Sequence, residues 1–467
     1  YASRMLSEAR GTLTKVKEYP PEKNVGKGKP RIGVFVCNCG INIGSVVNVP
    51  GVVDYVKGIE NVVYAQEFLF TCSQDSVEKI KEIISEQDLT RVVVASCTPR
   101  THAPLFQSAL REAGLNPYLY EHVNIREHSS WVHRDNKPGA TQKAKDLVRM
   151  AIAKVALLKP VTPTFTEVNH TSLVIGGGAA GMSAALSLGE QGFDVCLVEK
   201  EQQLGGHMKH IQYTLEGQDP QLELNSLIDQ VTNNSRITVY TGAEIQDSDG
   251  YPGNYRTIIK VSDKIEELEH GGNILATGAG AAKTEEYLYG QHPQVVTQVE
   301  LEQKLAAGDG TDLENIVMIQ CVGSRDQNRP YCSRICCQQA LKNALKLKEI
   351  NPKANIYILY RDIRSYGLME KYYTMARQKG IIFIRYNEQE KPKVSEQDNT
   401  LSVTVKEHVL GEFITIEPHL LVLSTGIVPN TENQRLSQLF KVPLDADGFL
   451  LEAHMKLRPV DFSAEGL

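Results

Sequence analysis

The sequence predicts an α/β protein with parallel sheets. Three observations carry this prediction: strand-like and helical patterns alternate along residues 31–138, a glycine-rich loop links a strand to a helix after Ser172, and the same rhythm returns near Glu314. Alternating strands and helices form parallel sheets, because each helix carries the chain back across the sheet. The length of 467 residues is sufficient for about three domains.

The composition is that of a soluble globular protein and argues against several classes. Hydrophobic residues make up 41% and charged residues 23%. Lys and Arg number 50 against 56 Asp and Glu, so a nucleic-acid surface is not expected. No apolar stretch reaches the ~18 residues of a membrane helix. Nine cysteines without a signal peptide favour a reducing compartment, the cytoplasm, and metal or redox chemistry over disulfides.

The N-terminal region predicts a first α/β domain. Each expected strand is a short apolar run, and each expected helix shows an amphipathic pattern. We expect strands at Ile32–Cys37, Val62–Phe70 and Arg91–Ser96, and helices at Gly51–Lys57, Gln74–Glu86, Pro104–Ala113 and Ala140–Leu158.

A dinucleotide-binding motif follows the next predicted strand. Gly176, Gly178 and Gly181 form G-x-G-x-x-G between the strand and a helix. The first glycine permits the turn, the second lets the backbone approach a pyrophosphate, and the third lets helix and strand pack closely. Glu199 ends the next strand, where an acid can bind a ribose hydroxyl. A glycine-rich turn is the alternative, but the strand, helix, second strand and acid agree.

Further turns favour FAD over NAD. A second glycine pair follows Glu199, and two later strands end in Ala-Thr-Gly and Ser-Thr-Gly. These features resemble the two-dinucleotide-domain flavoproteins of the thioredoxin reductase and glutathione reductase group, over about residues 171–467. The resemblance implies an FAD-binding fold. Besides the motif glycines and Glu199, the expected FAD contacts are Ala179, Ala180, Lys200, Gly205, Gly206, Ala276, Thr277, Gly278, Thr425 and Gly426.

Cysteines occupy the position at which that group binds NAD(P)H. After the strand Val317–Gln320 the loop starts with Cys321 and keeps only Gly323, so we expect no NAD(P)H site there. The spacing C-x10-C-x3-C-C lets the thiolates of Cys321, Cys332, Cys336 and Cys337 meet at one metal centre, with Cys332 and Cys336 one helical turn apart. Thiolates favour Fe–S or Zn, and a neighbouring flavin favours the redox-active choice. Packing of these cysteines in a core is the alternative.

Five parts are therefore expected. They are a helix and linker (1–30), an N-terminal α/β domain (31–138), a connecting helix and linker (139–170), an FAD-binding domain (171–312 and 412–467) and an inserted Rossmann-like domain with the Cys cluster (313–411).

The cysteine region makes the resemblance more specific. Residues 319–349, 359–367 and 449–462, together with the N-terminal GVFVCNCG and VVVASCTPRTHAPLF, resemble the family of A-type heterodisulfide reductase subunits. The resemblance implies FAD, a [4Fe–4S] cluster on Cys321, Cys332, Cys336 and Cys337, and flavin-based electron bifurcation in anaerobic metabolism. The donor would deliver two electrons, and the acceptors would be a low-potential ferredoxin and a disulfide. Lys342 matches a family lysine near the flavin, although a solvated helix lysine is the alternative.

The same resemblance implies partners. They are other heterodisulfide reductase-like subunits and a ferredoxin or hydrogenase- or dehydrogenase-type donor module, in a dimer of a larger complex. Many family members insert a ferredoxin-like domain near the segment matching Gly250–Tyr255, and the family carries C-terminal ferredoxin motifs. Neither occurs here, so we expect the 467 residues to be part of a longer polypeptide.

Cysteines also end the N-terminal strands. Cys37, Cys39, Cys72 and Cys97 follow three predicted strands, whose tips share one edge of a parallel sheet. These thiols are candidates for a second cluster, and buried structural thiols are the alternative. Cys196, inside a strand, is expected in the core.

Two rival functions remain open. A flavin disulfide reductase would use the vicinal Cys336 and Cys337 as a redox dithiol, and a structural scaffold would hold FAD without using it for catalysis.

Overall fold

The computed structural model describes all residues except 1, 14, 16 and 27, and it divides into two compact units, Gly11–Thr166 and Tyr1–Arg10 with Glu167–Leu467. The expected N-terminal helix is short: α1 covers Ala2–Met5, and a 3-10 turn covers Ser7–Ala9. Gly11 follows with a φ of +80°, a conformation that ends helices.

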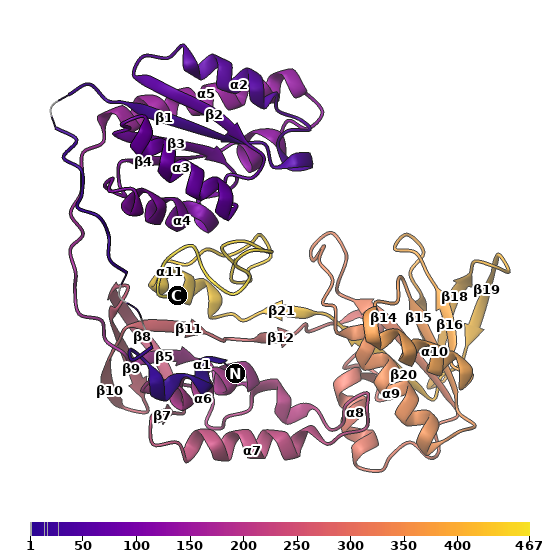
Figure 1. Cartoon of the computed structure of the whole chain (residues 1–467). Helices are drawn as coiled ribbons and strands as arrows, with labels where there is room; N and C mark the ends of the chain where they lie inside the picture. Colours follow the sequence, from indigo (N-terminus) through magenta and orange to yellow (C-terminus); the bar gives the residue numbers. More distant parts are fainter. Residues whose placement is uncertain (1, 14, 16, 27) are drawn as a thin grey trace. The chain divides into compact units, whose positions relative to one another are not determined.

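The first unit is built on a four-stranded parallel sheet in the order β2-β1-β3-β4 (Figure 1). Every residue of the two central strands is buried, as in sheets covered on both faces. One core layer joins alternate β1 residues to α2 and α5, and the other joins Phe35 and β3 residues to α3 and α4. The elements are β1 Ile32–Cys37, β2 Val62–Phe68, β3 Arg91–Ser96, β4 Tyr120–Asn124, α2 Val49–Lys57, α3 Gln74–Glu86, α4 Pro99–Glu112 and α5 Lys137–Leu157.

Helices α2, α4 and α5 begin earlier than their sequence predictions, and α4 differs most. The helix α4 begins at Pro99 instead of Pro104. Thr98 caps it, since its hydroxyl accepts a hydrogen bond from the Arg100 amide, and Pro99 suits the first helical position. Pro104 therefore lies inside the helix.

The first half of the second unit has a parallel sheet in the order β11-β5-β6-β7. Helices α6 and α7 pack on one face, and the antiparallel sheet β8-β9-β10 packs on the other. The elements are β5 Ser172–Ile175, α6 Ala179–Glu190, β6 Val195–Val198, α7 Pro220–Thr232, β7 Ile237–Tyr240, β8 Ala243–Tyr251, β9 Asn254–Val261, β10 Lys264–His270 and β11 Gly272–Leu275.

The second half repeats this plan with the parallel sheet β13-β20-β14-β15-β16 (Figure 1). Helices α8, α9 and α10 cover one face, and the antiparallel sheet β17-β18-β19 covers the other. The elements are β13 Val295–Thr297, α8 Gln298–Ala306, β14 Asn315–Val322, α9 Cys336–Ile350, β15 Asn355–Tyr360, α10 Glu370–Gln378, β16 Ile382–Arg385, β17 Lys393–Gln397, β18 Thr400–Glu407, β19 Glu412–Ile416 and β20 Leu420–Thr425.

The paired strands β12 (Ala279–Ala281) and β21 (Ile427–Pro429) carry the chain into and out of this half. The five-stranded sheet includes β13 and β20, which lie outside the expected range 313–411. We therefore propose that the inserted domain extends to the β12–β21 pair. Both halves are α/β with a dinucleotide-domain plan, as the sequence predicted.

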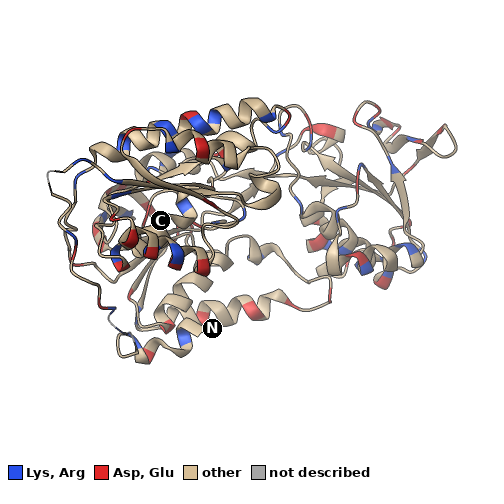
Figure 2. Cartoon of the chain, turned by 45° about the horizontal axis from the view of Figure 1, so that its top comes forward, with Lys and Arg blue, Asp and Glu red and all other residues tan. Residues whose placement is uncertain are grey.

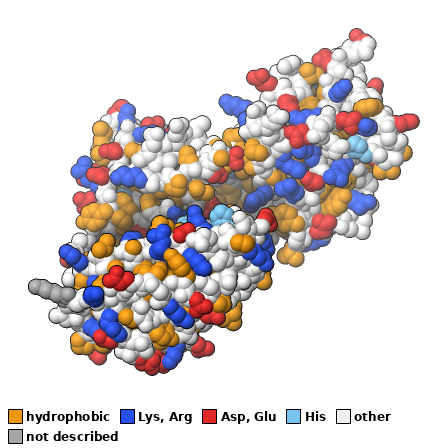
Figure 3. Space-filling view, turned by 90° about the horizontal axis from the view of Figure 1, so that it is seen from above, with side chains coloured by type: hydrophobic (Ala, Val, Ile, Leu, Met, Phe, Trp, Pro, Cys, Tyr) orange, Lys and Arg blue, Asp and Glu red, His pale blue; other side chains and the backbone are white. Residues whose placement is uncertain are grey.

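Charged side chains of both signs are interspersed along the helices and over the face seen from above (Figures 2 and 3). Among the described residues, no helix combines the length and apolarity that crossing a membrane requires.

Candidate functional site

The glycine loop after β5 leaves a space at the N-terminus of α6. Gly176 has a φ of +110°, and a Cβ atom on it would lie 2.3 Å from the Ala276 carbonyl oxygen. A Cβ on Gly181 would lie 1.8 Å from the Gly176 carbonyl oxygen. At Gly178, by contrast, a Cβ would approach only the Gly206 Cα, at 4.0 Å. The first and third glycines therefore allow close packing, while the second borders a cradle that suits a pyrophosphate.

The expected residues around this loop come together. The Gly205 amide donates to the Gly177 carbonyl over 2.8 Å, and a Cβ on Gly206 would lie 3.1 Å from the Gly178 Cα. The Ala276 amide donates to the Ile175 carbonyl over 2.8 Å. The backbone of Gly278 has a φ of +67°, and Ala179 and Ala180 are exposed in the first turn of α6.

Glu199 fixes the loop from the end of β6. Its carboxylate accepts hydrogen bonds from the Gly177 amide (2.6 Å) and the Glu201 amide (2.8 Å), and the residue is 7% exposed. It also lines a cavity of about 200 Å³ together with Gly176, Lys200 and Thr277. This cavity borders Glu199, the residue that the sequence analysis assigned to a ribose hydroxyl.

Part of the cavity wall was not predicted. Asn430, Glu432, Arg435 and Leu436 line it from the segment after β21 and from α11 (Asn433–Phe440). The side-chain amide Nδ2 of Asn430 donates to the Thr277 carbonyl oxygen over 3.0 Å. In the sequence this segment appears only as a turn after a strand. That pattern does not reveal that the segment packs beside Thr277.

Thr425 and Gly426 lie at the cysteine loop, not at the glycine loop. The Cys336 thiol is 3.5 Å from the Thr425 carbonyl, and a Cβ on Gly426 would lie 3.0 Å from the side chains of Ser324 and Ser333. Thr425 ends β20, which belongs to the five-stranded sheet, and Gly426 follows it, so their expected contact with FAD stays a prediction.

The four cysteines of the second half gather at the carboxyl end of β14. Burial, and then the thiols of the other three cysteines, raise the pKa of Cys336 to about 12. Burial also raises the pKa of Cys321 and of Cys337, and in both cases Cys332 adds to this effect. The thiols are therefore near enough to influence one another, as one shared centre requires.

The local backbone differs from the helical expectation. The helix α9 begins at Cys336, so Cys332 lies before it and the predicted i,i+4 relation on one helix is wrong. Arg334 has a φ of +65°, which an α-helix does not accept. Cys321 has a φ of +61° beside a register shift between β14 and β20, and such outliers concentrate at functional sites.

The donor atoms of this site are the thiols of four free cysteines. Among the residues that the structure describes, no three His, Cys, Asp or Glu side chains stand close enough to hold one metal ion. A [4Fe–4S] cluster offers each thiolate a different iron, so its four ligands are spread further apart than around one zinc ion. The all-thiol donor set is one that iron–sulfur clusters and zinc both accept.

Arginines surround the thiols. Arg325 Nη1 is 4.0 Å from Cys321 Sγ, and Arg325 Nη2 is 2.7 Å from the Asp362 carboxylate. Arg361 pairs with Glu388 at 2.9 Å, so it is a salt-bridging residue and not a free ligand for a phosphate. Sequence reasoning had left Arg325 without a role, because only the folded β15 brings Asp362 to it.

The side chain of Lys342 is largely shielded from solvent and paired, unlike that of a solvated helix lysine. Its ammonium lies 2.7 Å from the Glu302 carboxylate, and the two side chains are 11% and 1% exposed. The ammonium also lies 4.9 Å from the centre of the Tyr213 ring, and the Gln212 amide donates to Glu302 over 2.7 Å. Glu302 and Tyr213 were missed, since neither stands in a motif.

The N-terminal cysteines meet at one sheet edge. The pKa of Cys97 is raised to about 11, mainly by burial, and Cys72 and Cys37 add to this effect. The Thr71 amide lies 3.5 Å from the Cys37 thiol, and Cys39 has a φ of +46°.

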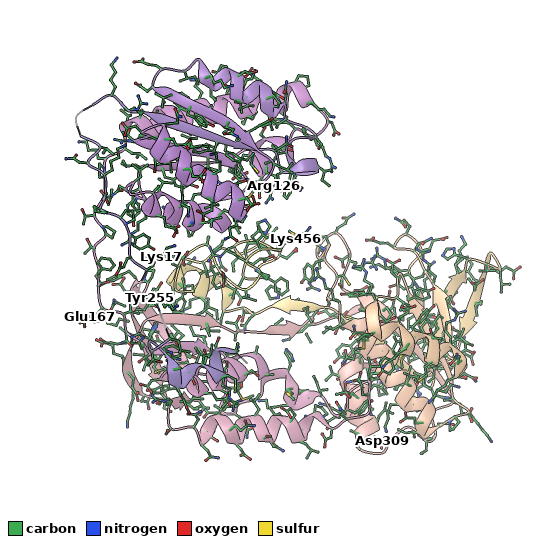
Figure 4. All side chains as sticks on the ribbon, in the orientation of Figure 1. Lys17, Arg126, Glu167, Tyr255, Asp309 and Lys456 are labelled. Atoms are coloured by element: carbon green, nitrogen blue, oxygen red, sulfur yellow. The ribbon has the colours of Figure 1, made fainter. Side chains whose placement is uncertain are left out.

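Arg126, labelled in Figure 4, borders this edge from the segment after β4 and was missed by sequence reasoning. It opposes the effect of burial on the pKa of Cys39 and Cys97. Among the described residues, four buried side-chain atoms of this edge have no hydrogen-bond partner: Thr71 Oγ1, Thr101 Oγ1, Arg126 Nε and Glu127 Oε2. Such orphaned atoms are typical of a site that a bound group completes.

Cys196 lies in β6 and packs against the core between β5 and β8, as expected. Burial raises its pKa.

Comparison with known proteins places the chain in a family. Residues 170–327 match the model of the pyridine nucleotide-disulphide oxidoreductases. An A-type iron-sulfur subunit of CoB–CoM heterodisulfide reductase from Methanopyrus kandleri is 36% identical over 94% of this chain and 81% of its own length. The A-type subunit of the H2:CoB-CoM heterodisulfide,ferredoxin reductase of Methanothermobacter marburgensis is 35% identical over 96% and 82%. Among solved structures, the thioredoxin reductase of T. acidophilum is similar with a TM-score of 0.41 and 18% identity, over 64% of this chain and 88% of its own.

The alignment with the first relative spans 535 positions, more than the 467 residues of this chain, so that relative carries segments without a counterpart here. The alignments cover 94% and 96% of this chain, so they include the N-terminal unit as well as the two dinucleotide halves. The chain belongs to the family of A-type heterodisulfide reductase subunits.

Proposed function

We propose that the chain is an oxidoreductase subunit that binds FAD and a [4Fe–4S] cluster and transfers electrons between them. The observation that carries the proposal is the contrast between the two halves. The first half keeps an open glycine cradle at Gly178, and the second half has four mutually influencing thiols where a nucleotide loop would stand. One half thus suits a dinucleotide, and the other suits a metal cluster.

Different residues are assigned to different parts of FAD. The pyrophosphate is expected on the amides at the start of α6, beside Gly178, where the helix dipole favours an anion. The ribose is expected beside Glu199, which lines the cavity. When bound, the flavin accepts an electron pair and releases single electrons, and the protein controls geometry and access.

The cluster is assigned to Cys321, Cys332, Cys336 and Cys337. The N-terminus of α9 presents its positive end near Cys336, which favours a thiolate. Lys342 follows one and a half turns later on the same helix, and we assign it, with its partner Glu302, as a candidate group near the flavin. A redox dithiol at Cys336 and Cys337 is less well supported, because Cys337 is buried and a disulfide substrate would have to reach the attacking sulfur.

We further propose that the reaction is an electron bifurcation within a larger assembly. The Methanothermobacter marburgensis relative is named as a reductase of both a heterodisulfide and ferredoxin, with H2 as the donor. By analogy, the partners of this chain would be other heterodisulfide reductase-like subunits and a ferredoxin or hydrogenase- or dehydrogenase-type donor module, in a dimeric complex of the cytoplasm. A multi-subunit assembly is consistent with relatives that are named as subunits.

Reduction of the flavin by different electron donors tests the proposed function directly. We expect dithionite to bleach the flavin of the anaerobic, FAD-loaded chain rapidly, and NADH or NADPH to leave it oxidised. The reason is that the loop starting at Cys321 has few glycines and that Arg361 is already paired. Stopped-flow absorbance at the flavin band measures both. Stoichiometric bleaching by NADH or NADPH would contradict the proposal, and no bleaching by dithionite would favour the scaffold role.

A second cluster is proposed at Cys37, Cys39, Cys72 and Cys97. The orphaned atoms beside these thiols support it. In the full chain, Cys97→Ser should lower the iron content by about four atoms per chain, the content of one cubane. The four thiols of the second unit should keep their own iron and EPR signal. Iron content equal to that of the unmodified chain would instead make the N-terminal cysteines structural thiols.

A further inference from the structure

Arg325 contacts a proposed cluster ligand and is held there from two sides. Its Nη1 lies 4.0 Å from Cys321 Sγ, and its Nη2 lies 2.7 Å from Asp362 Oδ2. Its carbonyl oxygen accepts a hydrogen bond of 2.5 Å from Arg361 Nη1. The Arg325 side chain is only 17% exposed, so the contact with the thiol lies largely out of water.

The partner acid ties this arrangement to a second thiol. Asp362 follows β15, and its carbonyl oxygen lies 3.6 Å from Cys337 Sγ. Arg361, the residue before it, is fixed by Glu388 at 2.9 Å. Asp362 thus contacts Arg325 through its carboxylate and Cys337 through its carbonyl oxygen. These contacts hold Arg325 more rigidly than an isolated surface ion pair would.

The positive charge of Arg325 affects how readily the proposed cluster is reduced. A [4Fe–4S] cluster with four thiolate ligands is an anion, and the one electron that reduces it makes it more negative. A guanidinium at a ligand sulfur stabilises the reduced form more than the oxidised form, because the site is largely shielded from solvent. Hydrogen bonds to sulfur and net charge are among the features that set cluster potentials.

We infer that Arg325 is a positioning residue that donates an N–H···S hydrogen bond to the Cys321 thiolate and raises the reduction potential of the cluster. The inference rests on the proposed cluster. Asp362 orients the guanidinium so that one edge faces the carboxylate and another faces the sulfur. Arginine suits this task because its planar fork presents donors in fixed directions.

The chain offers a matched control at Arg385. This arginine pairs with the same Asp362, at 3.6 Å, but its side chain is 63% exposed and makes no described contact with a thiol. Arg385→Gln therefore removes an equal charge from the same acid without touching the sulfur. Comparing it with Arg325→Gln separates the contact with Cys321 from general charge.

The test is an EPR-monitored redox titration of the cluster in the purified full chain. We expect Arg325→Gln to shift the reduction equilibrium at least tenfold toward the oxidised cluster, a fall of about 59 mV for one electron. Arg325→Lys should fall by less, and Arg385→Gln should stay near the unmodified chain. A full iron content with an unchanged midpoint in Arg325→Gln would overturn the inference.

Iron content separates the remaining outcomes. If Arg325→Gln loses its cluster and Arg325→Lys keeps it, a lowered midpoint in the lysine variant supports the inference and an unchanged midpoint overturns it. If both lose iron while Arg385→Gln keeps it, Arg325 serves cluster retention and the tuning role is overturned. Absence of a cluster in the unmodified chain would contradict the proposed function itself.

Discussion

Gly178→Leu is expected to yield a folded chain that does not retain FAD. A Cβ at position 178 meets only the Gly206 Cα, at 4.0 Å, so the fold itself tolerates a side chain there. The isobutyl group would instead fill the cradle at the start of α6 and block the approach of a pyrophosphate to the helix amides. The loss should approach completeness, since no other path brings the phosphates to those amides.

Flavin absorbance after gel filtration measures this loss. Thermal unfolding gives a second readout, because a ligand at about 1,000 times its Kd stabilises a protein by about 4.1 kcal/mol. Added FAD should raise the Tm of the unmodified chain and leave that of Gly178→Leu unchanged. Gly28→Leu, at an open linker position with nothing within 4 Å, is the control. A full flavin complement in Gly178→Leu would remove the FAD site from this loop.

Cys332→Ser is expected to remove one cluster. Serine cannot supply the soft thiolate that iron–sulfur clusters require, so about four irons per chain should be lost. Cys332 lies in the loop before α9, where the hydroxyl of serine fits without disturbing a core. The fold should therefore survive, and the loss of iron would report ligation instead of unfolding.

Iron analysis and EPR of anaerobically purified protein measure the change. Cys196→Ser is the matched control, because this cysteine packs beside β5 and β8 away from the other thiols. It should keep the iron content of the unmodified chain. Equal iron and an identical EPR signal in Cys332→Ser would exclude it as a ligand.

The sequence predicted best where local pattern determines structure. The strands β1 and β3 agree residue for residue with their apolar runs, because both faces of the sheet are covered and every position is buried. The close packing at Gly176 and Gly181 also follows the spacing of the motif between a strand and a helix. The thiols were found for the same reason, since their residue type is rare and their clustering is visible in one dimension.

What the sequence did not predict depends on contacts between distant segments. Lys342 reads as a surface residue until α8 brings Glu302 to it, and Arg325 gains its place only through Asp362. The helix α9 was expected to include Cys332, but the left-handed backbone at Arg334 delays its start. Thr425 and Gly426 carry the expected motif, yet their strand belongs to the other sheet.

At position 321 the left-handed backbone favours glycine, whereas ligation of a metal cluster requires cysteine. Gly176 opens the glycine loop with a positive φ, and Cys321, at the corresponding end of β14, also has one. A residue with a side chain incurs about 1–2 kcal/mol in that conformation, whereas glycine does not. Protein engineering toward higher stability of the metal-free chain would therefore select glycine at 321, and selection for metal affinity would retain cysteine. Both halves thus have a positive φ at this point, with glycine in one and cysteine in the other.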